Sequence, residues 1–231
     1  TDKRLWRVVE HYVEKALSRL DLSSLQAFGF DETASKRGHN YVTVFIDMAR
    51  KTLPVVFAIP GKGKKTVSEF KTFIEKHGAK PEQVLEVVCD MSPSFLSGVK
   101  DEFPKANVTV DWFHVVQLFT RAVDEVRKEE RKHSDMPKAL RWAVLKNAES
   151  PMTDKQAQAL LDLEQYELET AKAWRVKEKL RWIREAKTTQ AARWRLTNFI
   201  KFTLDEIGSS DALEPVRKAL ATLEKHSERI L

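Results

Sequence analysis

The sequence predicts a mixed α/β domain with a five-stranded sheet, followed by an all-helical region. Up to residue 111, short runs rich in β-branched and aromatic residues alternate with amphipathic, helix-like segments. From Trp112 onward the strand-like runs disappear, and apolar residues recur every three or four positions. At 231 residues the chain is long enough to bury a core of its own.

The first segments predict one helix and three strands. Residues 1–20 carry apolar side chains at helical spacing. Three extended runs follow, at residues 27–31, 41–46 and 53–59, and turn-forming residues 37–40 separate the first two. Connections this short imply that the neighbouring strands are antiparallel.

Two helices and two strands are expected next. A Thr-x-x-Glu capping box opens a helix over residues 66–77, and Gly78 ends it. The apolar run 84–89 predicts a strand, Ser and Pro then begin a helix over 92–103, and residues 108–110 form a short strand. Because helices connect these later strands, the strands should lie parallel to their neighbours in the sheet.

The remaining segments predict helices only. Apolar residues form a single stripe over 115–126. A Thr-x-x-Gln capping box at 153–156 opens a long helical stretch, which we expect to break near Asp162. Two more amphipathic segments cover 194–204 and 213–223. The expected organisation is therefore a connecting helix (1–25), an α/β core (26–125) and a helical insertion (126–231).

Composition limits the function classes. The chain has 40 Lys and Arg against 34 Asp and Glu, a formal charge of +6, which is compatible with a polyanionic partner although solvated helix faces also explain it. Cys89, the one cysteine, lies in an apolar run, which excludes a disulfide framework and a thiolate zinc site. There is no apolar stretch of about 20 residues and no signal-peptide pattern. We expect a soluble, cytoplasmic protein.

Two aspartates are the main candidates for chemistry. Asp31 and Asp90 each follow an apolar strand, and α/β sheets bind ligands beyond the carboxyl ends of their strands. If the two strands are adjacent and parallel, the carboxylates lie together and their hard oxygens suit Mg²⁺ or Mn²⁺. Two such metals promote phosphodiester displacement. The alternative is that each aspartate only starts a turn or caps the next helix.

Several segments, in order along the chain, carry a resemblance to a known family. They are Phe28–Thr33, Lys36–Thr43, Asp90–Ser92, Asp111–Val116, Ala122–Arg127, Arg141–Asn147 and a run from Ala171 to Arg181. Together these segments resemble the DDE transposases of the ISL-three type of insertion sequence. The resemblance covers nearly the whole chain.

The resemblance implies a ribonuclease-H-like fold in which Asp31 and Asp90 are the first two catalytic acids and bind Mg²⁺ or Mn²⁺. The family's third acid is a Glu in an Asn-Gly-x-x-Glu segment, which does not occur here. The family's N-terminal zinc-binding and helix-turn-helix regions do not occur either. We therefore expect a catalytic-core fragment that is inactive by itself, from a bacterial or archaeal protein acting at the nucleoid.

In the complete protein, the resemblance implies metal-dependent cleavage of DNA at insertion-sequence ends and transfer of the freed strand to target DNA. Its partners would be double-stranded DNA, with terminal inverted repeats and a target, and a second copy in a homodimer. Two alternatives stay open: another ribonuclease-H-like nuclease, such as a junction resolvase or an RNA-cleaving enzyme, and a non-catalytic DNA-binding relic of a transposase.

Several other residues could serve either the site or the structure of the protein. Glu32 should alternate to the other face of its strand, where it has a structural role or supports the site without binding the metal. Asp111 should cap the helix that follows, and His114 either reaches substrate or packs nearby. The run 61–66 lacks the spacing of a phosphate-binding loop, which excludes nucleotide binding.

Clustered basic residues are candidates for contacts to the DNA backbone. The candidates are Lys62, Lys64, Lys65, Arg121, Arg127, Lys128, Arg131, Lys177 and Arg181. Glutamates that lie between these basic residues reduce the local positive charge. The helical spacing of Trp142, Trp174, Trp182 and Trp194 predicts buried core positions and not a base-stacking platform.

Overall fold

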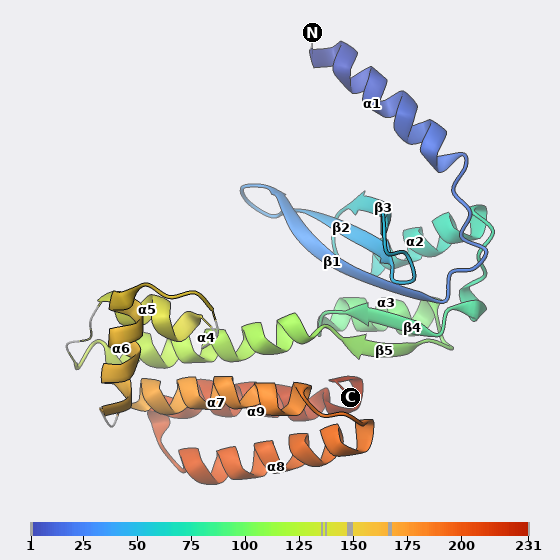
Figure 1. The fold of residues 1–231 in the computed structure, drawn as a ribbon. Helices are drawn as coiled ribbons and strands as arrows, with labels where there is room; N and C mark the ends of the chain where they lie inside the picture. The colour runs from blue at the N-terminus through green and yellow to red at the C-terminus, as the bar shows by residue number, and fades with distance from the viewer. Residues whose placement is uncertain (1, 135, 137, 147–149, 166–167, 231) are drawn as a thin grey trace. The chain divides into compact units, whose positions relative to one another are not determined.

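The protein is described here by a computed structural model that covers residues 2–134, 136, 138–146, 150–165 and 168–230. The chain forms two compact units, Thr1–Thr109 and Val110–Leu231 (Figure 1). The division lies before the segment 112–126, which we had grouped with the α/β core. Each unit is described by itself.

The first unit contains the expected five-stranded sheet. Its strand order is β3-β2-β1-β4-β5, and the sheet is mixed, as predicted. The elements are α1 (Asp2–Leu17), β1 (Ala27–Lys36), β2 (Asn40–Asp47), β3 (Val55–Pro60), α2 (Lys64–Lys76), a 3-10 turn (Pro81–Gln83), β4 (Glu86–Cys89), α3 (Pro93–Glu102) and β5 (Asn107–Val110).

Strand directions follow from the connections between the strands. Strands β1, β2 and β3 are joined by short loops and pair antiparallel. After β3 the chain passes through α2 and crosses to the far side of β1, where β4 pairs parallel to β1. The chain then passes through α3 to β5, beside β4. The predicted parallel pairing of the first and fourth strands is therefore confirmed.

Strand β1 is longer than the sequence suggested. We expected it to end at Asp31, but residues beyond Asp31 continue to pair with β2, from Asp31 opposite Val44 to Lys36 opposite Asn40. This extension carries polar residues and lacks the apolar alternation that marks a strand in sequence. The turn that closes the hairpin contains Gly38, at a φ of 91°, a region that glycine adopts without strain.

Phenylalanine side chains form the core between the sheet and helices α2 and α3. Phe28 of β1 packs edge-on against Phe70 of α2, with ring centroids 4.8 Å apart, and against Phe103 at 5.0 Å. Phe45 of β2 stacks on Phe70 at 4.2 Å. All four side chains are fully buried, and burying each contributes about 1.5–3 kcal/mol relative to exposure. This cluster fixes which face of β1 points inward.

The helices that cover the sheet begin and end close to the predicted positions, with one correction. The capping box at Thr66 and Glu69 is wrong, because α2 already begins at Lys64 with Gly63 as its N-cap. The Thr66 hydroxyl instead donates to the Gly63 carbonyl at 2.8 Å. At the other end, Gly78 adopts the positive φ expected of a helix stop.

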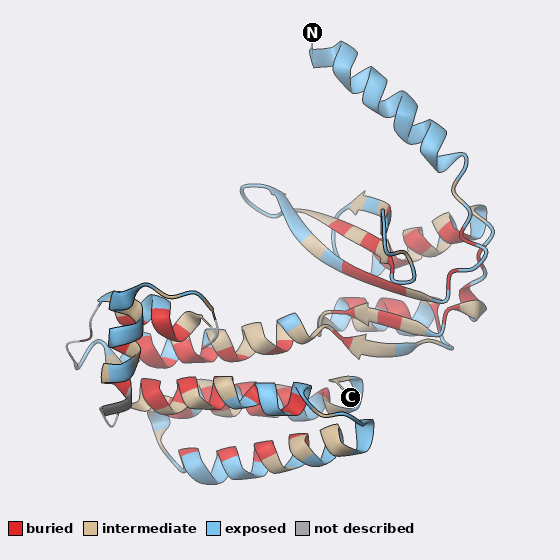
Figure 2. Cartoon of the chain, viewed as in Figure 1, coloured by how far each residue is buried: buried red, intermediate tan, exposed pale blue. Residues whose placement is uncertain are grey.

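Helix α1 is amphipathic, as predicted, but none of its residues is buried (Figure 2). Its apolar stripe includes Trp6 and Tyr12, which are 65% and 64% exposed. Cys89 is a buried free thiol, as expected. Among the described helices, none has both the length and the apolar content needed to cross a membrane.

The second unit is helical throughout its described residues. Helix α4 packs against α5, α7 and α9, while α7 also packs on α8 (Figure 1). The elements are α4 (Trp112–Glu130), α5 (Lys138–Leu145), α6 (Asp154–Gln165), α7 (Glu169–Arg184), α8 (Thr189–Ile207), a 3-10 turn (Asp211–Leu213), α9 (Glu214–Lys225) and α10 (Ser227–Ile230).

The predicted capping box at residues 153–156 is confirmed. The backbone amide of Thr153 donates to Gln156 Oε1 at 3.1 Å, and the Gln156 amide donates back to Thr153 Oγ1 at 3.4 Å. The expected break near Asp162 is misplaced, because α6 continues to Gln165 and α7 begins at Glu169. Residues 166–167 lie outside the described part of the chain.

Three of the four tryptophans assigned to the core are exposed. Trp174 is 8% exposed, as predicted, but Trp142, Trp182 and Trp194 are 55%, 38% and 62% exposed. Trp182 and Trp194 lie edge-on to each other, with ring centroids 5.8 Å apart. Helical spacing does not reveal which face a neighbouring helix will cover, and this explains the error.

A buried lysine ties α7 to the end of α5. Lys177 is 3% exposed, and its Nζ donates to the carbonyl oxygens of Val144, at 2.9 Å, and Lys146. It also pairs with Glu178 at 3.0 Å. The last carbonyls of a helix have no partner inside the helix, so the lysine supplies the missing donor. The segments 141–146 and 171–181 are thereby held together.

A glutamate makes a similar connection at the start of α7. The carboxylate of Glu130, at the end of α4, accepts hydrogen bonds from the amides of Glu169 and Thr170 and from the Thr170 hydroxyl, at 2.8, 2.9 and 2.6 Å. A carboxylate at a helix N-terminus satisfies free amides and complements the helix dipole.

We predict that Lys177→Ala destabilises the helical unit by about 3 kcal/mol, because it leaves buried carbonyls and a partly buried carboxylate without their donor. Urea unfolding followed by circular dichroism measures the change. Lys179→Ala is the matched control, since Lys179 is exposed and pairs with Glu206 at 2.5 Å; it should cost about 1 kcal/mol or less. Equal losses in the two variants would contradict a structural role for Lys177.

Candidate active site

Asp31 lies within β1, and Asp90 directly follows the neighbouring parallel strand β4. The last paired residues of β1 and β4 are Gly29 and Val88. Each aspartate lies two residues further along its strand direction. Neighbouring strands are about 4.8 Å apart. A continuation of this register by two residues would set the two aspartates side by side just beyond the β1–β4 pairing.

The two aspartates also belong to the same face of the sheet. Phe30 and Cys89, which precede them, are 5% and 1% exposed and point into the core. Because side chains alternate along a strand, the next residues point to the opposite face. Asp31 is exposed and Asp90 is half-buried. Both carboxylates are therefore accessible from solvent, away from the phenylalanine core.

Backbone amides orient each carboxylate. The Glu32 amide donates to Asp31 Oδ1 at 2.8 Å, and the Ser92 amide donates to Asp90 Oδ1 at 2.8 Å. Ser92 is the N-cap residue of α3, as predicted, but its side chain makes no cap hydrogen bond. Such contacts restrict the rotation of each carboxylate and fix the direction of its oxygens.

The donor set fits a hard divalent cation. Two carboxylates placed side by side repel each other unless a positive charge lies between them, and Mg²⁺ and Mn²⁺ prefer oxygen ligands. No group of three or more His, Cys, Asp or Glu side chains forms a metal site within the described residues.

The other predicted site residues lie in both units. Glu32 is on the face of β1 opposite Asp31, as expected, with its Oε2 buried. Asp111 is the N-cap of α4 and accepts a hydrogen bond from the Phe113 amide at 2.9 Å, which confirms its capping role. His114 is half-buried in the first turn of α4, with its ring 5.4 Å from that of Phe113.

The basic loop after β3 is exposed and already makes contacts within the protein. Lys62 Nζ lies 4.1 Å from the centre of the Tyr41 ring. Lys64 pairs with Asp101, and Lys65 lies 3.6 Å from Glu69. Ion pairs at the surface contribute little to stability, so the three lysines remain available to a polyanion.

Two of the basic candidates do not fit a contact with DNA. Arg127 is 4% exposed and donates twice to Asp124, and Lys177 is 3% exposed. Burial lowers the pKa of Lys177, opposed by the charge of Glu178. Both side chains serve the packing of the helical unit. The other helical candidates, Arg121, Lys128, Arg131 and Arg181, are exposed.

A mixed sheet of order β3-β2-β1-β4-β5, with one aspartate within β1 and another directly after β4, is consistent with a ribonuclease-H-like core. A family described as "Transposase", the DDE transposases of the ISL3 type, matches residues 28–231. The chain belongs to this family of DNA transposases.

Individual relatives agree with the family. The chain is 28% identical over 150 residues to the transposase for insertion sequence element IS1001 of Bordetella parapertussis, which covers 62% of this chain and 36% of that protein. It is 31% identical over 126 residues to the transposase for IS1557 of Mycobacterium tuberculosis, covering 54% of this chain and 26% of that protein. The matched region thus spans about a third of the curated relatives' length.

We predict that Mn²⁺ raises the melting temperature of this chain and that Asp31→Asn and Asp90→Asn abolish the rise. A ligand that binds only the folded state stabilises it in proportion to RT ln(1 + [L]/Kd). Without metal, each variant should be as stable as the wild type or more stable by about 0.5 kcal/mol, because a like-charge contact is removed. Differential scanning calorimetry with and without EDTA measures both effects.

Asp205→Asn is the control, since it removes one exposed carboxylate from α8. It should leave the Mn²⁺-dependent shift unchanged. A shift that survives in Asp31→Asn and in Asp90→Asn would place the metal elsewhere.

Proposed function

We propose that this chain supplies the metal-binding centre of a transposase that cleaves DNA at insertion-sequence ends and joins the freed end to target DNA. The observation that supports the proposal most directly is the parallel register of β1 and β4, which would set Asp31 opposite Asp90 if it continued for two more residues. Membership of the DDE transposase family supplies the reaction class.

Asp31 and Asp90 are the proposed ligands of Mg²⁺ or Mn²⁺. Metal bound there would activate the attacking oxygen and stabilise the leaving oxygen of a phosphodiester. The protein's own contribution is position: backbone amides hold one oxygen of each carboxylate, and the phenylalanine core holds the two strands in register. Glu32, with its Oε2 buried behind Asp31, is proposed as a positioning residue for this strand.

The proposed reaction has two chemically balanced steps. In the first, water attacks a phosphorus at the element end, and the bond from phosphorus to the 3′ oxygen breaks, leaving a 3′ hydroxyl and a 5′ phosphate. In the second, that 3′ hydroxyl attacks a phosphodiester of target DNA, forming one ester bond while another breaks. Neither step needs an external energy source, because the first is a hydrolysis and the second replaces one phosphoester bond with another.

The two carboxylates are an incomplete ligand set for this chemistry. The family's third acid, a Glu, has no counterpart in the sequence of this chain. We propose that a carboxylate from outside residues 1–231 completes the site and that the chain alone cleaves DNA poorly. The full-length gene product and its paired DNA ends, held by a dimer, form the proposed active assembly.

The full-length gene product should nick a duplex carrying its terminal inverted repeats in Mg²⁺ or Mn²⁺. Asp31→Asn or Asp90→Asn should lower the rate about a thousandfold or more, since metal binding contributes several kcal/mol and each 1.36 kcal/mol is about tenfold. Gel assays of end-labelled DNA measure the rate, and circular dichroism verifies folding. Asp205→Asn should cut at the wild-type rate.

An RNA/DNA hybrid offered beside the inverted-repeat duplex separates the transposase from a ribonuclease-like enzyme. Preferential cutting of the duplex supports the proposal. Folded variants that still cut at the wild-type rate would contradict the assignment of Asp31 and Asp90.

A further inference from the structure

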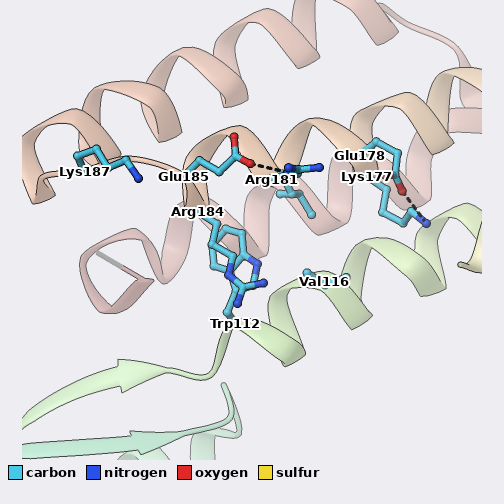
Figure 3. A pocket seen from close by; sticks show the side chains of 9 residues that line it. Trp112, Val116, Lys177, Glu178, Arg181, Arg184, Glu185 and Lys187 are labelled. Atoms are coloured by element: carbon cyan, nitrogen blue, oxygen red, sulfur yellow. Dashed lines mark hydrogen bonds and ion pairs between the residues drawn. The ribbon is translucent and has the colours of Figure 1, made fainter. Parts of the chain in front are cut away.

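The helical unit contains a pocket of about 410 Å³ between the beginning of α4 and the second half of α7 (Figure 3). Trp112 and Val116 of α4 line one side. Arg181 and Arg184 lie one helical turn apart on α7 and line the other side. Lys187, from the turn that follows α7, completes this basic wall.

The pocket carries a surplus of positive charge. Four basic and two acidic side chains line it, which leaves a surplus of two. Both acids are already paired: Glu178 with Lys177, and Glu185 with Arg181 (Figure 3). Arg184 and Lys187 form no ion pair with any residue that the structure describes. They are therefore the cations available to a ligand from solution.

The same two cations also line an adjoining pocket of about 310 Å³. Trp112, Arg184 and Lys187 belong to both pockets, and the second also reaches Thr188 and Thr189. Thr188 is the N-cap of the 19-residue helix α8, so the positive end of that helix dipole points at the second pocket. Two neighbouring hollows that share their cations suit a polymer with repeated negative charges better than a single small anion.

We propose that Arg184 and Lys187 bind consecutive phosphates of the DNA backbone across these two pockets. The proposal rests on the proposed function, since it takes the DNA that a transposase acts on as the ligand. An arginine fork matches phosphate oxygens with two parallel hydrogen bonds, and a lysine supplies a mobile point charge. No base-reading geometry is involved, so the contact is independent of DNA sequence.

Fluorescence anisotropy of a labelled duplex tests the proposal on the 231-residue chain in EDTA, where metal bound at Asp31 and Asp90 contributes nothing. Arg184→Ala/Lys187→Ala should weaken binding on the order of tenfold at moderate salt, and should lower the slope of log K against log salt by about one per residue. Both losses should be equal for unrelated DNA sequences. Arg184→Lys should keep the salt slope while binding more weakly than wild type.

Lys218→Ala/Lys225→Ala is the matched control, because it removes two exposed positive charges from α9 in the same unit and outside both pockets. It should leave the affinity within about twofold of wild type. Equal losses in the two double variants would overturn the proposal, since only overall charge would then matter. The proposal would also be overturned if inorganic phosphate displaced the duplex at the same phosphate concentration as the DNA, because the site would then bind small anions.

The proposals for the pocket and for the metal centre can be tested separately. Asp31→Asn/Asp90→Asn should bind the duplex like wild type in EDTA, although cleavage by the full-length protein is lost. If no cleavage is found for any full-length protein but the pocket variants still reduce binding, the pocket assignment stands and the catalytic proposal falls. If the full-length protein cuts as proposed but Arg184→Ala/Lys187→Ala binds normally, the catalytic proposal stands and the pocket assignment falls.

Discussion

The parallel pairing of β1 with β4 is the constraint on which the candidate active site depends. A shift of one residue in this pairing would move Asp90 to the opposite face from Asp31, because side chains alternate along a strand. The buried face prevents such a shift: Phe28 and Phe30 must point toward α2 and α3, and Val87 must follow them. Hydrophobic packing on one face of the sheet thus determines the position of charged groups on the other.

Much of this arrangement could be predicted from the sequence, because apolar strands and their order carry strong signals. The mixed five-stranded sheet and its helical crossovers were predicted from residues 27–111, whereas the adjacency of the first and fourth strands was only a condition of the site. The extension of β1 beyond Asp31 could not be predicted, since its polar residues are stabilised by pairing with β2 and not by burial. The start of α2 was missed for a local reason: the backbone of Gly63 begins the helix without a side-chain cap.

The helical unit shows where helical spacing stops being informative. Spacing located the helices but not their buried faces, so exposed Trp142 and Trp194 were assigned to the core, and buried Arg127 and Lys177 to a DNA surface. Lys177 reaches carbonyls more than thirty residues away, whereas Arg127 pairs with Asp124, three residues earlier in the same helix. Lys187 was not singled out at all, because only the folded turn after α7 brings it to the pocket of Arg184.

The buried position of Cys89 has a practical consequence for measuring how the two units are arranged. At 1% exposure its thiol is shielded from reagents in solution, and it is the one cysteine of the chain. A cysteine introduced at one surface position in each unit would therefore be the reactive thiol there, with no need to replace the native one. Spin labels or fluorophores attached to such pairs would report the separation of the sheet and the helices, free and on DNA.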